Sequence, residues 1–221
     1  MCGRFTLTID AKQLALAFGL IEIPAGWQPR YNIAPTQLVL GVREAESPKG
    51  EWMRWGLIPS WAKDPTIGNR LINARAETLT EKPAFRSALI SRRCLILADG
   101  FYEWRRSGGK SLSQPFLFRL KNGTPFAFAG LWDAWRNGAG EPVLSCTLIT
   151  CSANAMVGEV HKRMPVILDR EQCWDWLRAN PLSRLMDLLR PYPPEKMEMI
   201  PVGQIVNNPA TDDPVCIQPA R

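Results

Sequence analysis

Five short runs rich in β-branched and aromatic residues constrain the fold more than any other feature of the sequence. They span residues 94–98, 101–105, 115–120, 126–132 and 143–150, with turn-forming residues between them. Short glycine-containing loops at residues 107–111 and 137–140 join neighbouring runs, and strands joined in this way pair antiparallel. We therefore expect a curved, mainly antiparallel β-sheet or incomplete barrel.

The sequence also predicts helices, which would cover the open ends of this sheet. The first spans residues 8–18, which Asp10 can cap and Gly19 can end. Pro83 opens a second at residues 83–90, and others follow at residues 153–160, 170–178 and 182–189. Two further strand-like runs lie at residues 37–42 and 51–58. Because 46% of the 221 residues are hydrophobic and no linker is visible, we expect one α+β domain over residues 1–221.

Cys2 directly follows the first methionine, so removal of Met1 would leave a cysteine as the first residue. Such a residue is a 1,2-aminothiol, whose amine and thiol have ordinary pKa values of about 7.7–8.0 and about 8.5, so that the amine is partly uncharged and some thiolate is present. An aldehyde can condense with the amine, and the sulfur can then close a thiazolidine ring. A buried, incidental or lipidated cysteine is the alternative, although the sequence elements that lipidation requires are missing.

The net charge of +6 and the sequence pI of about 9.2 favour a polyanionic partner. Several arginines stand beside aromatic residues or turn glycines, and this pattern suits single-stranded nucleic acid, because guanidinium groups hold phosphates while flat rings stack on bases. The alternative is an ordinary solvated surface over a core that contains most of the nine tryptophans.

The cysteines do not have the spacing of a zinc site. They stand at positions 2, 94, 146, 151, 173 and 216, without a C-x-x-C pair, and the sequence holds one histidine, His161. We therefore expect no metal, and we expect Cys94, Cys146 and Cys173 to be small core residues. Since no leader or membrane-length apolar run is visible, we expect a cytoplasmic protein that joins the nucleoid when bound to DNA.

Polar residues interrupt apolar surroundings at two places. Asn73, Arg75 and Glu77 alternate with alanines, so in an extended segment their side chains would project from one face, whereas turn and cap chemistry is the alternative. His161 is the side chain that normally titrates near neutral pH, and it is either a proton-transfer group or a satisfied structural histidine.

Glu103 stands within the aromatic run Phe101-Tyr102-Glu103-Trp104. Partial desolvation there would raise the pKa of its carboxyl group toward values useful for proton transfer. The alternative places the carboxylate on the wet face of the sheet, paired with Arg105 or Arg106.

Seven segments, in this order, resemble those of the SRAP (SOS response-associated peptidase) family. They are MCGRF at residues 1–5, YNIAPT at 31–36, WGLIPSW at 55–61, NARAET at 73–78, GFYEW at 100–104, AGLW at 129–132 and HKRMPVIL at 161–168. The resemblance covers residues 2–207 and leaves a short C-terminal tail at 208–221. Asp133 and Cys151 depart from the family pattern, where glutamate and threonine are common.

The resemblance implies a protein that binds single-stranded DNA and links its N-terminal cysteine to the ring-opened aldehyde of an abasic site as a thiazolidine, which shields the lesion. Cys2 would then provide the amine and thiol, Glu103 would shuttle protons, and His161 would protonate the sugar ring oxygen. Asn73 would hold the sugar or the N-terminal segment. No cofactor is implied.

The same resemblance predicts a DNA-contacting surface. Arg4, Arg75 and Arg163 would bind phosphates, and Trp61 and Trp104 would stack on bases or wedge between them. Gly3, Pro35 and Thr150 would line the pocket. We expect a monomer that acts on abasic sites in single strands and at single-strand to double-strand junctions.

Two other functions compete with this prediction. An autoprocessing peptidase would use Cys2 to attack an acyl carbon, and removal of Met1, by itself or by an aminopeptidase, would be its smallest form. A noncovalent single-strand binder would not use the cysteine at all. A weak lyase activity on abasic DNA is a further expectation of the family resemblance.

Overall fold

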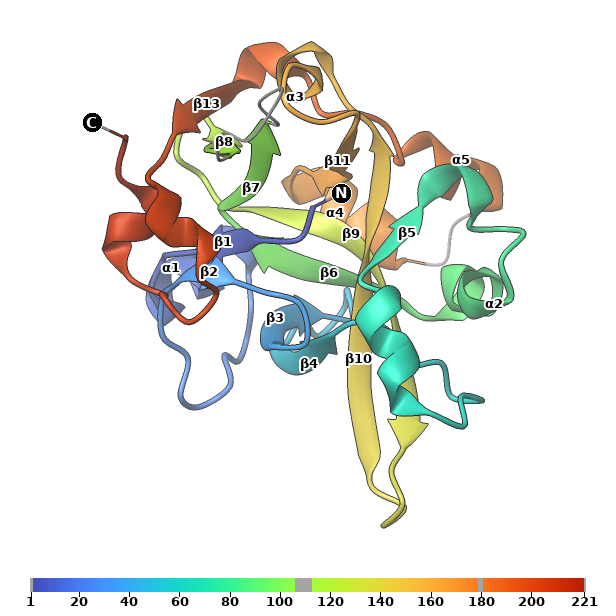
Figure 1. Ribbon diagram of the computed structural model, residues 1–221. Helices are drawn as coiled ribbons and strands as arrows, with labels where there is room; N and C mark the ends of the chain where they lie inside the picture. Colours follow the sequence, from blue (N-terminus) through green and yellow to red (C-terminus); the bar gives the residue numbers. More distant parts are fainter. Residues whose placement is uncertain (1, 106–112, 179–180, 221) are drawn as a thin grey trace.

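The fold is built on a β-barrel that five strands close. The structure, a computed structural model, describes residues 2–105, 113–178 and 181–220, so the predicted loop at 107–111 lies outside the described residues. The ring runs β3–β4–β10–β9–β6 and back to β3, with every pairing antiparallel except the parallel β10–β4 pair. The strands are β3 (Leu38–Val42), β4 (Glu51–Trp55), β6 (Arg93–Ala98), β9 (Phe126–Arg136) and β10 (Pro142–Ser152). The expected α+β class and antiparallel sheet are confirmed, and the barrel is closed (Figure 1).

The barrel closes through its two longest strands, β9 and β10, which pair with each other from Leu148↔Gly130 to Pro142↔Arg136. The other edge of β9 pairs with β6, and the other edge of β10 pairs with β4. Gly130 permits the close approach of neighbouring side chains, since a Cβ there would lie 2.8 Å from Cδ1 of Ile96 and 3.0 Å from Sγ of Cys94. Three short strands extend this sheet: β5 (Asn73–Arg75) and β11 (Arg163–Pro165) on β10, and β12 (Ile167–Leu168) on β9.

A second sheet packs beside the barrel and carries the N-terminal segment. Its order is β13–β8–β7–β1–β2, all antiparallel, from β1 (Phe5–Leu7), β2 (Arg30–Ile33), β7 (Gly100–Arg105), β8 (Gln114–Leu120) and β13 (Met197–Pro201). Phe5 joins the two sheets, because its ring contacts Trp55 and Phe128 of the barrel at 5.1 and 5.6 Å. The core therefore fixes the chain three residues after Cys2.

The five helices lie where the sequence predicts them; four are shorter than predicted, and α2 is one residue longer. α1 (Ala11–Phe18) begins at an Asp10 capping box and ends at Gly19, which has φ 60°. The others are α2 (Pro83–Ser91), α3 (Ala155–Gly158), α4 (Arg170–Leu177) and α5 (Leu182–Asp187), with 3₁₀ turns η1 (Pro65–Arg70), η2 (Ala76–Thr78), η3 (Pro194–Lys196), η4 (Gln204–Asn207) and η5 (Pro214–Ile217). Within the described residues no helix has the length and apolarity needed to cross a bilayer.

The C-terminal tail, residues 208–220, packs against strand β2. Asp212 accepts hydrogen bonds from the backbone N–H groups of Tyr31 and Asn32 at 2.5 and 2.9 Å, so the tail holds strand β2. Cys216 is fully buried in a small second core with Tyr102. Figure 1 shows this segment, in red, beside β1 and β2, with the amino terminus at the centre of the front face.

Candidate active site

Asn73 fixes the backbone of Cys2. Its Nδ2 donates a 2.8 Å hydrogen bond to the carbonyl oxygen of Cys2, and its Oδ1 is buried without a hydrogen-bond partner among the described residues. Asn73 reaches this position because β5 pairs in parallel with β10, where Asn73 stands opposite Leu148. The predicted link between Cys2 and the NARAET segment is thus present as a direct contact.

The Cys2 thiol is fully buried. Burial first, and then the negative charge of Glu103, raise the pKa of the thiol far above its ordinary value. The thiol lies 3.7 Å from the carbonyl oxygen of Arg4, to which its S–H can donate. In the chain that still carries Met1, this enclosed position beside a carboxylate favours the neutral thiol.

Glu103, in β7, is buried with 4% of its surface exposed. Burial raises the pKa of its carboxyl group, and the charge of His161 opposes the rise. The wet-face alternative is therefore wrong, since Arg105 instead pairs with Glu159 at 3.5 Å, and Arg106 lies outside the described residues. The predicted desolvated carboxyl group is confirmed by this burial.

His161 faces the same carboxyl group from the turn that follows α3. Its Nδ1 lies 3.9 Å from Oε1 of Glu103 and 3.1 Å from both the backbone nitrogen and the carbonyl oxygen of Arg163. A neutral ring can accept from that N–H, whereas a protonated ring can donate to the carbonyl oxygen or interact with the carboxylate. The ring is thus held in place in either state, with about a third of its side chain, 32%, exposed.

Arg163 is tied to the protein at both ends of its guanidinium group. Nη1 and Nη2 donate to the two carboxylate oxygens of Glu77 at 2.7 and 2.9 Å, and Nη2 also donates to the carbonyl oxygen of Thr150 at 2.6 Å. The arrangement arises because only Asn73–Arg75 is extended, while Ala76–Thr78 coils into η2. The expectation that residues 73, 75 and 77 share one strand face is therefore wrong, since the 3₁₀ turn takes Glu77 out of the strand.

Arg4 and Trp104 form a neighbouring group. Nη1 of Arg4 donates to Oδ1 of Asn32 at 2.7 Å and to the carbonyl oxygen of Val206 at 2.8 Å, and its guanidinium carbon lies 5.9 Å from the centre of the Trp104 ring. Nε1 of Trp104 donates to Asn207 at 2.6 Å. These two predicted DNA-contacting residues therefore lie together.

The other predicted DNA-contacting positions lie around these groups. Arg75 is exposed and stands opposite buried Thr150 in the β5–β10 register. Trp61 is exposed over 60% of its surface. Gly3, which directly follows Cys2, is half-buried, and Pro35 is half-buried in the turn between β2 and β3.

Sequence reasoning missed two supporting residues. Asn32 is fully buried, and its Nδ2 donates to the carbonyl oxygens of Val206, Asn208 and Thr211, which anchors η4 beneath Arg4. Asp212 lies in the tail that the resemblance left out. In the sequence, the signal for Asn32 was a polar residue between Tyr31 and Ile33. No sequence pattern marked Asp212.

The described residues contain no group of three or more His, Cys, Asp or Glu side chains that could hold a metal ion. The fold and site define an α+β protein with a buried thiol and carboxyl group beside a half-buried amide and imidazole. Arginines, one exposed indole and one half-buried indole surround them. The family model described as SOS response associated peptidase (SRAP) matches residues 1–209, and the chain belongs to this family.

Several relatives share most of the chain. It is 43% identical to "Abasic site processing protein YoqW" of Bacillus subtilis (strain 168), over 99% of each chain, and 44% identical to "Abasic site processing protein YoaM" of the same organism, over 95% and 94%. It is 33% identical to "Abasic site processing protein HMCES" of Rattus norvegicus, over 100% of this chain and 76% of the relative. A crystal structure of a Bacteroides thetaiotaomicron protein superposes with a TM-score of 0.90 at 26% identity and covers both chains fully.

Proposed function

We propose that this protein processes abasic sites in DNA by forming a covalent thiazolidine link through Cys2. Relatives at 33–44% identity carry the name abasic site processing protein. The observation that supports the chemistry most is the meeting of three groups: the buried Cys2, the buried Glu103 whose charge acts on it, and His161 at 3.9 Å from that carboxyl group.

The reaction balances without a cofactor. The cyclic hemiacetal of the abasic sugar opens when its ring oxygen gains a proton and its C1 hydroxyl loses one, which gives an aldehyde. The amine of Cys2 adds to the aldehyde carbon, and the carbinolamine loses water to give an imine. The Cys2 sulfur then forms the C–S bond, and its proton goes to the nitrogen. The net change is one aldehyde and one aminothiol giving a thiazolidine and one water.

The surroundings of Cys2 assign a role to each polar group. Glu103, with its raised pKa, can give a proton to the departing hydroxyl of the carbinolamine and take one from the neutral thiol. Burial also raises the pKa of the thiol, so little thiolate is present. A general base therefore has to remove the thiol proton as the sulfur attacks the imine carbon. His161 can protonate the sugar ring oxygen, and Asn73 holds the Cys2 backbone so that the amine is presented in one orientation.

The proposed DNA strand runs over the exposed cations and rings around this site. Arg75 and Trp61 are accessible for a phosphate and a base, respectively. Arg4 and Arg163 use part of their guanidinium groups within the protein, so we propose that each contributes positive potential and at most one outward donor group. The substrate is a single strand or a single-strand to double-strand junction, bound by a monomer.

A denaturing gel tests the chemistry. The protein mixed with an abasic oligonucleotide should give a heat-stable adduct, and Cys2→Ala should give none while still binding undamaged strands, since phosphate contacts and stacking supply most of the affinity. With borohydride, Cys2→Ala should become trapped through its amine. Cys151→Ser is the matched control for a second buried thiol near the site, and it should crosslink normally.

The mass of the purified protein tests the first step. A chain that begins at Cys2 should form the adduct, and a fraction that retains Met1 should not, because a blocked nitrogen cannot form the imine. Cleavage of a peptide panel without any DNA adduct would instead support the peptidase alternative. Binding of abasic DNA with no adduct in either mass fraction would support the noncovalent one.

A further inference from the structure

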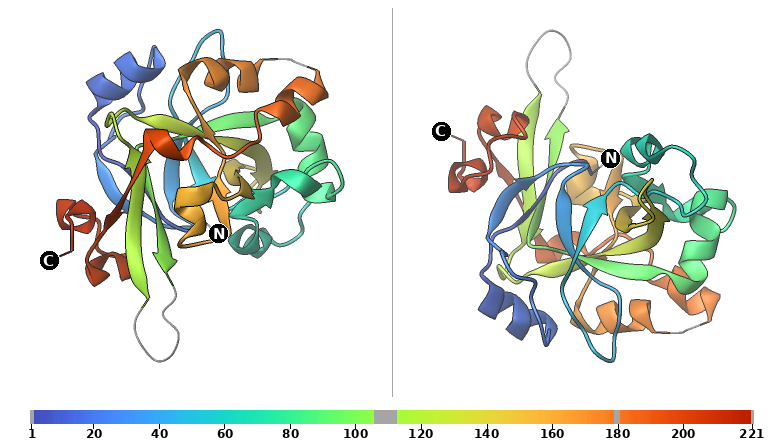
Figure 2. Two further views of the ribbon diagram at one scale, coloured as in Figure 1. Left: turned by 90° about the horizontal axis from the view of Figure 1, so that it is seen from above. Right: turned by 90° about the horizontal axis from the view of Figure 1, so that it is seen from below.

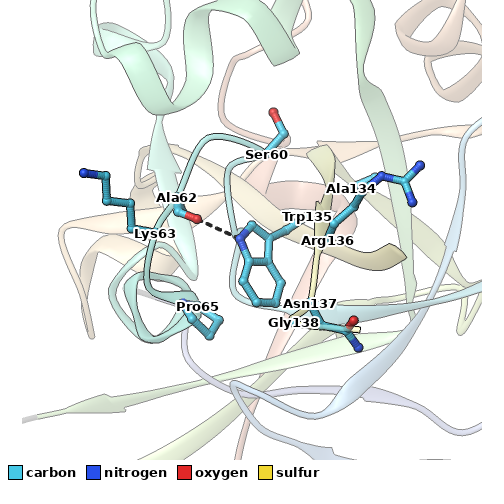
Figure 3. A pocket seen from close by; sticks show the side chains of 9 residues that line it. All are labelled: Ser60, Ala62, Lys63, Pro65, Ala134, Trp135, Arg136, Asn137 and Gly138. Carbon is cyan, nitrogen blue, oxygen red and sulfur yellow. Dashed lines mark hydrogen bonds between the residues drawn. The ribbon is translucent and has the colours of Figure 1, made fainter. Parts of the chain in front are cut away.

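A hollow lies outside the Cys2 group, between the segment before η1 and the turn end of the β9–β10 hairpin. It has a volume of about 690 Å³ and is lined by Ser60, Ala62, Lys63, Pro65, Ala134, Trp135, Arg136, Asn137 and Gly138. Figure 3 shows the Trp135 indole in its centre, between the side chains of Lys63 and Arg136. In the sequence, Trp61, the exposed residue proposed to contact DNA, lies between Ser60 and Ala62, which both line the hollow.

Hydrogen bonds from the barrel hold this hollow in shape. Nε1 of Trp135 donates to the carbonyl oxygen of Ala62 at 2.7 Å, and the backbone N–H of Ser60 donates to Oδ2 of Asp133 at 2.9 Å. Asp133 is buried and lies 3.3 Å from Nε of Arg92. The 60–62 segment is therefore fixed at both ends, and a ligand that binds beside it does not have to order a loop first.

The lining carries the chemistry that recognises a nucleotide. Lys63 and Arg136 are exposed cations on either side of a half-buried indole. Two carboxylates stand in the same segments: Asp64 accepts from the backbone N–H of Thr66 at 2.8 Å, and Glu141 accepts from Nδ2 of Asn137 at 2.9 Å. Nη1 of Arg136 donates to the carbonyl oxygen of Gly140 at 2.7 Å, which leaves the other end of the guanidinium group for a ligand. One aromatic face between two cations fits a base flanked by its two phosphates.

The place of the hollow connects it with the proposed DNA path. In both views of Figure 2 the teal segment that contains η1, β5 and η2 lies next to the amino terminus, whereas α1 lies on the opposite side of the molecule. Figure 1 shows η1 on the front face, between β5 and the β9–β10 hairpin. A strand that leaves Cys2 past Arg75 and Trp61 is thereby led toward Lys63.

We propose that this hollow binds a nucleotide of the DNA strand outside the lesion, with its base against Trp135 and its phosphates at Lys63 and Arg136. The proposal rests on the proposed function, since it extends the same strand. It implies that strands long enough to reach the hollow bind more tightly than short ones, and that the gain comes from one side of the lesion only.

The test combines Lys63→Ala with Arg136→Ala. Three abasic oligonucleotides are compared: a trinucleotide with the lesion at its centre, and two strands of about 15 nucleotides extended on the 5′ or on the 3′ side, a length within the roughly 4–16 nucleotides that single-strand-binding folds cover. The matched control combines Lys12→Ala in α1 with Lys121→Ala after β8, which removes the same charge from exposed sites elsewhere.

The double variant should bind one of the two long strands on the order of tenfold more weakly, with a salt dependence flattened by about 1.4, which is two phosphate contacts at about 0.7 each. The control variant should change neither. Equal loss on both long strands, or no loss on either, would overturn the proposal. If wild-type protein forms an adduct with none of the three oligonucleotides, the proposed function fails, and the long-strand affinities still decide whether the hollow binds DNA.

Discussion

Arg163 and Glu77 form a two-point ion pair, with Nη1–Oε1 and Nη2–Oε2 distances of 2.7 and 2.9 Å. The pair joins β11 to η2, and its arginine also holds the carbonyl oxygen of Thr150 in β10. Because Nδ1 of His161 lies 3.1 Å from the backbone nitrogen of Arg163, the ion pair helps to position the proposed proton donor. Arg163 thus supports the site from within, while Arg75 faces outward.

This difference predicts distinct results for two arginine substitutions. Arg75→Ala should weaken binding to undamaged single strands and flatten the salt dependence by about 0.7, the value for one phosphate contact. Arg163→Ala should change that slope less but should lower the melting temperature, because Thr150 loses a buried donor and Glu77 loses its partner. Salt titrations and thermal melts of both variants measure this; an equal slope change would make Arg163 a phosphate ligand.

Glu103→Gln should stabilise the protein at neutral pH. The folded-state pKa of Glu103 is raised, so the folded chain holds this proton more tightly than the unfolded chain, and ionisation above the folded pKa costs stability. The advantage of the glutamine variant should therefore shrink as the pH falls toward the unfolded value of about 4.3. Melting curves between pH 4 and 8 test it, with the exposed Glu159→Gln as control. A variant less stable than wild type at pH 8 would contradict the prediction.

The same substitution should slow the proposed chemistry. Loss of one positioned acid–base group costs about 10²–10⁴ in rate when proton transfer limits, so Glu103→Gln should slow both formation and reversal of the adduct. His161→Ala should mainly slow formation, because ring opening precedes imine formation. Rates of both directions across pH, with folding checked by circular dichroism, provide the measurement. Wild-type rates in both variants would show that Glu103 and His161 have only a structural role.

Trp61→Ala should weaken binding to single strands without affecting the fold. The indole is 60% exposed and lies outside the core clusters of the described residues, so its removal leaves the core intact. A base stacked on it is worth about 1–3 kcal/mol, whereas an exposed side chain contributes within about 0.5 kcal/mol to stability. Leu16→Ala, which removes an apolar side chain that is 69% exposed from α1, is the control. Unchanged affinity would remove Trp61 from the DNA path.

The sequence by itself determined seven of the strands, the places of the five helices and the identity of the candidate reactive groups. Asp10 and Gly19 predicted both ends of α1, because capping depends on neighbours only a few residues away. Glu103 among aromatics predicted a desolvated carboxyl group, since residues in a short strand share their burial with adjacent ones. The family resemblance added the candidate roles, for which local patterns left alternatives open.

Tertiary structure alone decided how these groups meet. Barrel closure requires β10 to pair with β4, far earlier in the chain, and no local pattern encodes a pairing between distant segments. The turn of Glu77 into η2, the pairing of Arg163 and the burial that raises the pKa of the Cys2 thiol all follow from that packing. Desolvation and charge contacts depend on what surrounds an atom in space, so the pKa that matters for the chemistry is a property of the fold.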